Sequence, residues 1–471
     1  MKARLTAFWD AVQSSYWFIP SLMTLGAIAL SFALTTLDGV LGPDWMGRVS
    51  WLYANKPEGA RAVLSTIASS MIGVAGVTFS ITIASVVYAS GQYGPRLLTN
   101  FMRDRGNQVT LGTFIATFIY CLLVLRTVRD AQEESDAFSP ADDVVGAFVP
   151  HVAILTGLVL ALASIAVLIY FIHHIPSSIH VSNVLAGVGR DLERKVRALF
   201  PHRIGDRPGT PDDVARGDLP ERFYEDAARV RADGSGYVQG VDVETVLGLA
   251  TAHDLLLRLQ HRPGDFVSDG DALLLVWPPE ALSDELCRKL RRAYAWGDQR
   301  TPVQDARFLV NELVEIASRA LSPGVNDPFT AITCIDWLGS ALKALADADM
   351  PGAARVDETG RLRVIAHPTS FEEFVEAMFG QLRPYAAADV NAARRVLHAL
   401  GEAAPHLGTD ARRQAVRAEA DALLAGAEAV QQVPADLETI RRAHRTVVRL
   451  LSGRAEYERY AAASPDVGGT A

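Results

Sequence analysis

The sequence predicts an α-helical membrane protein: four transmembrane helices, then a cytosolic α+β region in which a small β-barrel or sandwich unit precedes a helical domain. The main observation is a run of 46 residues, 144–189, without a single Asp, Glu, Lys or Arg. Its centre, Val152 to Phe171, has about the 20 apolar residues that span the hydrocarbon core of a bilayer. The second observation is uneven charge, since residues 177–471 hold 35 of the 45 Lys and Arg. An apolar membrane part is therefore followed by a charged, soluble part.

Three earlier segments are also long and uncharged enough to cross a membrane. They are Trp17–Leu37, a stretch within Ala62–Pro95, and Gly106–Leu125. The first follows Lys2 and Arg4, as the apolar part of a signal peptide would. It is longer than the roughly 7–15 apolar residues of a signal peptide, so we expect a retained span.

The basic residues of the short connections predict the orientation of the spans, because Lys and Arg are enriched on the cytoplasmic side. The connection after the second span holds Arg96, Arg103 and Arg105. The connection after the third span holds Arg129 beside six acidic residues. With the basic N-terminus, this pattern places both ends of a multi-pass chain in the cytoplasm.

The second span is rich in hydroxyl and glycine residues. Two stripes recur at helical spacing: Ser69, Gly73, Gly76 and Ser80 form the first, and Thr78, Thr82 and Ser85 the second. Small residues let helix backbones approach closely, and hydroxyls bond across helices. The span is therefore either packed tightly in a bundle or oligomer interface, or it lines a water-filled path.

The centres of the four predicted spans carry no charged residue, which argues against a coupled pump that relays protons or ions. His173 and His174 lie near the inner end of the fourth span. Histidines there are either ordinary interfacial residues or a titrating gate, since imidazole changes charge near neutral pH. This pair is the candidate gate.

Beyond the fourth span the pattern changes several times. Apolar residues at helical spacing from Val181 to Leu199 predict a helix that continues the span, and the Pro- and Gly-rich stretch 201–220 predicts a linker. In the next part, apolar and polar residues alternate between glycine-containing turns, a pattern typical of small β-barrels and sandwiches. Helical patterns then dominate, with a hairpin at 354–366. We expect a four-span domain at 1–176, a connector helix and linker at 177–220, a small β domain at 221–280, a mainly helical domain at 281–463 and a disordered tail at 464–471.

The β domain is similar to the barrel of biotinyl and lipoyl carrier domains in its segment RPGDFVSDGDALLLV. Those carriers attach a cofactor to a lysine, and this chain has no Lys between Lys195 and Lys289. We therefore expect no cofactor. The three cysteines lie far apart, so their spacing predicts no metal site. The acidic balance of the soluble part argues against nucleic acid as a partner.

Polar residues gather between positions 305 and 327. They are Asp305, Glu312, Glu315, Asn326 and Asp327. Carboxylates in so short a window could bind a small charged ligand, or they could cap helices and pair with arginines. Asp followed by Pro at 327 and 328 fits a helix start. The chain has no phosphate-binding loop and no HExxH or GxSxG motif, so we expect no enzyme activity.

SGYVQGVD, RPGDFV and EIASRALSPGVNDPFTA, with ASGQYGPRLLTNFMRDRGNQVTLGTFIATFIY near the N-terminus, resemble a widespread bacterial family of predicted integral membrane proteins. That family is catalogued only as a domain of unknown function. The resemblance covers almost the whole chain. It implies a bacterial inner-membrane location and a cytosolic C-terminal region, and it implies no reaction.

Three functions fit these features. The first is an oligomeric, channel-like protein whose pore is lined by the second span and gated or assembled by the cytosolic region. Four spans per chain are few for a solute path, so several copies would share one. The second is a membrane-anchored sensor or scaffold whose cytosolic region binds a small ligand or a partner. A transporter is third. The expected partners are the lipid bilayer and further copies of this chain.

Overall fold

The computed structural model describes residues 15–41, 57–93, 104–129, 148–200 and 219–453. The chain divides between His180 and Val181 into two compact units, each with its own core. Most of the predicted linker, the tail at 464–471 and most of the charged connections that predict the orientation lie outside the described residues.

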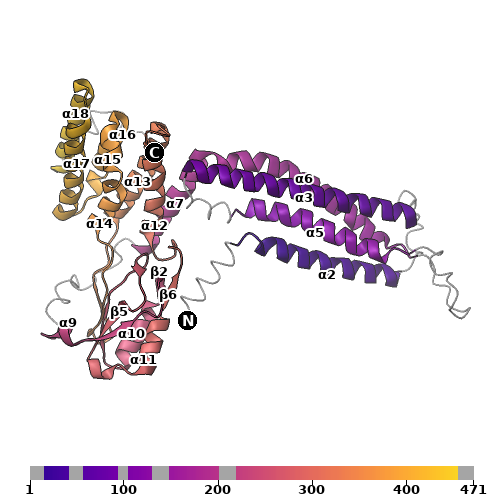
Figure 1. The fold of residues 1–471 in the computed structure, drawn as a ribbon, viewed down its shortest axis with the longest axis horizontal. Helices are drawn as coiled ribbons and strands as arrows, with labels where there is room; N and C mark the ends of the chain where they lie inside the picture. The colour runs from indigo at the N-terminus through magenta and orange to yellow at the C-terminus, as the bar shows by residue number, and fades with distance from the viewer. Residues whose placement is uncertain (1–14, 42–56, 94–103, 130–147, 201–218, 454–471) are drawn as a thin grey trace, which may run out of the picture. The chain divides into compact units, whose positions relative to one another are not determined.

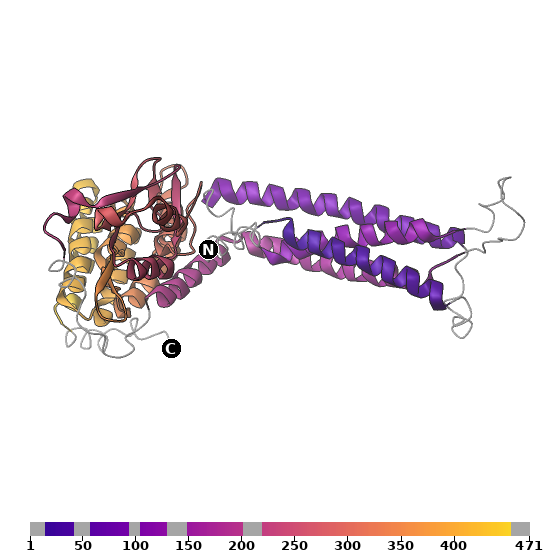
Figure 2. The same ribbon diagram turned by 90° about the horizontal axis from the view of Figure 1, so that it is seen from below.

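The first unit is a bundle of four long helices that lie side by side (Figures 1 and 2). Each helix coincides with one of the predicted apolar segments. A helical conformation suits such a segment in lipid, because a helix satisfies its backbone polar groups internally. α5 packs against the other three helices and contributes the buried side chains of Phe114 and Tyr120 to the core. The helices are α2 (Phe18–Leu41), α3 (Pro57–Tyr93), α5 (Arg105–Thr127) and α6 (His151–Ile179).

Contacts between helix ends show that successive helices run antiparallel. The Asp38 carboxylate near the end of α2 accepts hydrogen bonds from the backbone N–H groups of Val152 and Ala153, each at 3.0 Å, in the first turn of α6. The Arg61 guanidinium near the start of α3 donates to the Val128 carbonyl oxygen, just after α5, at 3.0 Å. A two-residue β-bridge joins the chain after α5 to the chain before α6. These four termini therefore meet at one end of the bundle.

Five of the described helices are long and apolar enough to cross a membrane by length and composition. Four belong to the bundle, and the fifth is α13 (Pro328–Asp347) in the second unit. In the most apolar 18-residue stretch of α13, 56% is buried inside the protein, whereas the corresponding stretches of the bundle helices are 17–44% buried. Such burial leaves α13 little surface for lipid and supports a count of four spans, which stays a prediction.

The second unit begins with α7 (Val181–Leu199), the helix predicted after the fourth span. The sequence predicted that this helix would continue α6, but the two helices are separate. His180 (ψ 122°) lies outside the helical region of the backbone and ends α6. α7 buries Leu185, Val188 and Leu192 and packs against α12 and α13.

The strands form two sheets. The larger has the order β1-β5-β3-β8-β7 and the smaller β4-β2-β6. β3 and β8 pair in parallel although about a hundred residues separate them, so the larger sheet draws on chain far beyond the predicted β domain. The pairing does not confirm a closed barrel. The strands are β1 (Ala228–Arg231), β2 (Gly236–Val241), β3 (Leu256–Leu259), β4 (Phe266–Val267), β5 (Ala272–Trp277), β6 (Tyr294–Gly297), β7 (Ala354–Val356) and β8 (Leu362–Ile365).

Short helices accompany the strands, and longer ones form a helical layer around α13, which packs against α7, α12 and α16. A π-helical turn, η4 (Glu376–Gly380), directly follows α14. The other helices are α9 (Phe223–Asp226), α10 (Val243–Ala252), η3 (Pro279–Ala281), α11 (Asp284–Arg292), α12 (Ala306–Ala320), α14 (Phe371–Val375), α15 (Arg383–Ala388), α16 (Val390–Glu402), η5 (Ala404–His406), α17 (Asp410–Val430) and α18 (Pro434–Leu451).

Candidate functional site

The two stripes of α3 lie on opposite faces of the helix. Thr78 and Thr82 are buried at 3% and 4% exposure, on the face that packs into the bundle. Their hydroxyls donate to carbonyl oxygens of their own helix, those of Val74 at 3.0 Å and Thr78 at 2.9 Å. Ser85 is half-buried near the same face. This stripe fills a helix interface.

The other stripe faces outward. Ser69, Gly73, Gly76 and Ser80 are all exposed in the single chain. A Cβ added at either glycine would meet no atom within 4 Å. The Ser80 hydroxyl donates to the Gly76 carbonyl oxygen at 2.8 Å, so it needs no partner outside its own helix. The seven predicted residues therefore do not line one surface; four form an uncovered face and the other three turn toward the bundle.

The interior of the bundle is filled by side chains. Phe114, Tyr120 and Cys121 of α5 are at most 1% exposed. The Thr117 and Ser164 hydroxyls, from α5 and α6, hydrogen-bond to each other at 3.1 Å. These side chains pack the bundle around α5.

The two predicted gate histidines have different surroundings. His174 Nε2 lies 2.8 Å from the Asp104 carboxylate, and its ring stacks on Tyr170 with 5.0 Å between centroids. Asp104 also caps α5 by accepting from the Gly106 N–H at 2.7 Å. His173 is exposed. His174 thus joins the end of α6 to the start of α5, a role that the sequence did not indicate because Asp104 is seventy residues away.

Asp305 is a buried capping residue. It is 3% exposed, accepts from the Arg307 N–H at 3.1 Å as the N-cap of α12, and pairs with the guanidinium groups of Arg300 and Arg307. Glu312 is buried and Glu315 half-buried further along the same helix. Capping and pairing with arginines was one of the two alternatives that the sequence left open for this carboxylate, but the sequence did not identify Arg300 and Arg307 as its partners.

Asn326 and Asp327 shape the connection between α12 and α13. Asn326 has φ 51°, in the left-handed region that Asn tolerates better than most residues. Asp327 caps α13, accepting from the Thr330 N–H at 3.2 Å and the Thr330 hydroxyl at 2.6 Å. Asp305 lies at the other end of the 15-residue α12, so the five polar residues do not converge on one ligand. Among the described residues, no group of three or more His, Cys, Asp or Glu could hold a metal ion.

Several apolar helices long enough to cross a membrane, together with a separate α+β unit, are typical of a membrane protein. The family model for predicted membrane proteins DUF2254 matches residues 13–402, and the chain belongs to this family. It is 32% identical over 427 residues to the uncharacterized protein Rv1290c of Mycobacterium tuberculosis, covering 89% of this chain and 77% of that one. The uncharacterized protein Mb1321c of Mycobacterium bovis matches with the same identity and coverage. No solved structure is significantly similar to the chain.

Proposed function

We propose that this protein is a homo-oligomer of the bacterial inner membrane in which the outer stripes of α3 from several copies gather around one axis and line a polar path. Four helices of each copy span the bilayer, and residues 181–471 lie in the cytosol, where they gate or assemble the pore. The carrying observation is the uncovered stripe of Ser69, Gly73, Gly76 and Ser80.

Two physical arguments support the proposal. A helix face that stays in lipid gains nothing from small residues, whereas a face that meets another helix gains close backbone approach. Buried side chains pack the described bundle around α5, which favours a path on a surface shared between copies over one within a single copy. The stripe holds hydroxyls and glycines without charge, which suits a narrow wet surface.

The first test is cysteine cross-linking in native membranes. Single cysteines at Ser69, Gly73 and Ser80 are introduced after Cys121, Cys287 and Cys334 have been replaced by Ala. Oxidation should give disulfide-linked dimers from these positions. Leu162→Cys is the matched control, because Leu162 is 67% exposed on the outer face of α6. Equal cross-linking at all four positions would contradict an α3 interface.

The second test is ion flux into liposomes that contain the purified protein. Flux should fall strongly in Gly76→Leu, which fills the stripe, and should persist in Gly26→Leu, which fills an equally open position on α2. Cross-linking without any flux would support the oligomer and refute the path. In that case the membrane-anchored sensor or scaffold becomes the better explanation.

A further inference from the structure

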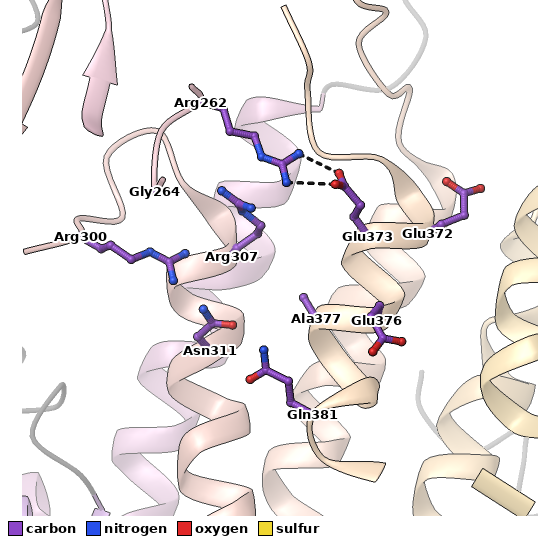
Figure 3. A pocket seen from close by; sticks show the side chains of 10 residues that line it. All are labelled: Arg262, Gly264, Arg300, Arg307, Asn311, Glu372, Glu373, Glu376, Ala377 and Gln381. Atoms are coloured by element: carbon purple, nitrogen blue, oxygen red, sulfur yellow. Dashed lines mark hydrogen bonds and ion pairs between the residues drawn. The ribbon is translucent and has the colours of Figure 1, made fainter. Parts of the chain in front are cut away.

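The second unit contains a charged cavity of about 620 Å³. It lies between the turn after β3, the start of α12, and the helical segment formed by α14 and η4 (Figure 3). Its volume falls within the roughly 300–1,000 Å³ of small-molecule sites. None of the candidate residues taken from the sequence lines it.

One wall of the cavity presents two guanidinium groups, whose charges the carboxylates of Asp305 and Asp265 offset. Buried Asp305 accepts from Arg300 Nε at 3.1 Å and from Arg307 Nε at 3.3 Å, and Arg307 Nη2 donates to the Pro263 carbonyl oxygen at 3.0 Å. These bonds hold both guanidinium groups in place. The Nη1 atom of each donates to no residue in the described ranges, so it is free to bind a ligand. Two fixed, partly buried guanidinium groups form a preorganised site for a carboxylate or phosphate.

The opposite rim is anionic. Glu372 forms no ion pair with any residue that the structure describes, and Glu376 pairs through Oε2 with Arg383 at 2.9 Å. Glu373 does not add to this charge, because it forms a bidentate pair with Arg262, at 2.8 and 3.0 Å, that bridges the two walls. Figure 3 shows Glu372 and Glu376 on the side of the cavity farther from Arg300.

Two amide side chains lie between the walls. Asn311 and Gln381 point into the space below the Arg262–Glu373 bridge (Figure 3). Neither side chain hydrogen-bonds to another described residue, so each keeps its donors and acceptor for a ligand.

The backbone of the glutamate side is irregular. Glu376–Gly380 forms a π-helical turn, an arrangement that is rare and frequent at functional sites. Gly380 makes room for the Glu376 carboxylate, since an added Cβ there would lie 2.0 Å from Glu376 Oε1. The turn is an independent observation at the same cavity.

We propose that this cavity binds a small zwitterion. Its carboxylate or phosphate lies against Nη1 of Arg300 and Arg307, and its ammonium group faces the carboxylates of Glu372 and Glu376. The arginine wall offers N–H donors and the glutamate rim offers carboxylate oxygens, so an ion of a single sign finds complementary groups on one side only. A ligand that carries separated charges of both signs matches both walls. The site does not depend on what the outer face of α3 does.

The binding test uses purified full-length protein and isothermal titration calorimetry. The probes are the common amino acids and phosphoethanolamine, which separate a free amino acid from a lipid-headgroup phosphate. The best amino acid is then compared with its N-acetyl form, a pure anion, and its carboxamide, a pure cation. For phosphoethanolamine the comparison is with inorganic phosphate and ethanolamine. The zwitterion should bind at least about tenfold more tightly than either half, equivalent to about 1.4 kcal/mol. No binding by any probe, or tighter binding of a half, would overturn the proposal.

Two variants separate a ligand contact from a structural role. Glu372→Gln should weaken binding of the zwitterion by about fivefold and strengthen binding of the pure anion, because the rim loses one negative charge. Asn311→Ala should weaken both. Glu280→Gln, at an exposed carboxylate outside the cavity, is the matched control and should change neither. Glu372→Gln with unchanged affinity for both probes would refute the assigned orientation.

Discussion

Asn326 shows how one residue sets the path of the chain. Its φ of 51° places it in the left-handed region, where a Cβ-bearing side chain is strained unless it is Asn or Asp. Asn326→Ala should lower the free energy of unfolding by about 1 kcal/mol, whereas Asn326→Gly should leave it equal or higher. Urea unfolding of the purified protein measures both. Equal losses would show that the Asn side chain, rather than the backbone angle, matters.

The pair between Arg383 and Glu419 places a buried carboxylate in the helical layer. Glu419 is 4% exposed, and Arg383 Nη2 lies 2.6 Å from its carboxylate. Burial raises the pKa of Glu419, against the opposing effect of Arg383.

Arg383→Gln leaves the Glu419 carboxylate buried without its charge partner and should cost about 3 kcal/mol of stability. Arg441→Gln breaks an exposed pair with Glu428 and should cost below about 0.5 kcal/mol. Thermal unfolding compares the two variants. Similar small effects would mean that water or another group compensates Glu419.

Glu402 should make stability depend on pH. Its hydrogen bond with His398 and its contact with Lys343 lower the pKa of Glu402 to about 2. The carboxylate has a pKa near 4.3 when unfolded, so the stabilisation is complete above about pH 4.5 and is lost as the pH falls toward 2. After allowance for solvent screening it amounts to roughly 1–2 kcal/mol. The melting temperature of Glu402→Gln should therefore lie below that of the wild type at pH 5, and this difference should shrink as the pH falls to 3. A constant difference would exclude this linkage.

Residue-scale prediction works where the chemistry is local. Asp327 before Pro328 predicts a helix start, and the structure confirms it through the bond to the Thr330 N–H. The arginines that pair with Asp305 and the Asp104 partner of His174 were not predicted. Tertiary packing brings the His174 pair together across seventy residues, and spacing carries no signal for such a pair.

At the scale of elements, Gly189 fixes the crossing of α7 and α13. A Cβ there would lie 2.2 Å from the Trp337 ring, so the ring or the helix backbone would have to shift. Gly189→Ala should cost about 2 kcal/mol or more through overpacking. Gly187 lies two residues earlier on an open face. Gly187→Ala should raise the free energy of unfolding by about 0.5–1 kcal/mol, because Ala has the higher helix propensity. Chemical denaturation of both variants tests the contrast, and equal effects would mean that Trp337 reorients freely.

The long helices were predictable because their apolar patterns are strong and continuous. The faces of α3 follow from helical spacing, which already places Ser69 and Thr78 on opposite sides. The break at His180 was not predicted, since apolar residues continue through it. The β domain and the hairpin at 354–366 were predicted, but their union in one sheet was not, because the pairing of β3 with the distant β8 leaves no local mark in the sequence.

At the scale of the whole molecule, the question is whether α13 is a fifth membrane span. With four spans, we expect α13 on the cytoplasmic side of the membrane. Phe329, in the first turn of α13, is 79% exposed, whereas Cys334 is fully buried. A Phe329→Cys variant should react with a membrane-impermeant maleimide in inside-out vesicles and stay unreactive in intact spheroplasts. The parent protein controls for Cys334. Protection on both sides would indicate that α13 enters the bilayer.

The contact between Asp38 and the start of α6 has a consequence for biosynthesis. The carboxylate accepts its two hydrogen bonds from amides 114 and 115 residues further along the chain. While the ribosome is still making the intervening segments, α2 carries this carboxylate near its C-terminal end without these bonds. α2 therefore reaches its final state only after α6 has been made. A chain that stalls before α6 would present the Asp38 carboxylate without these two donors.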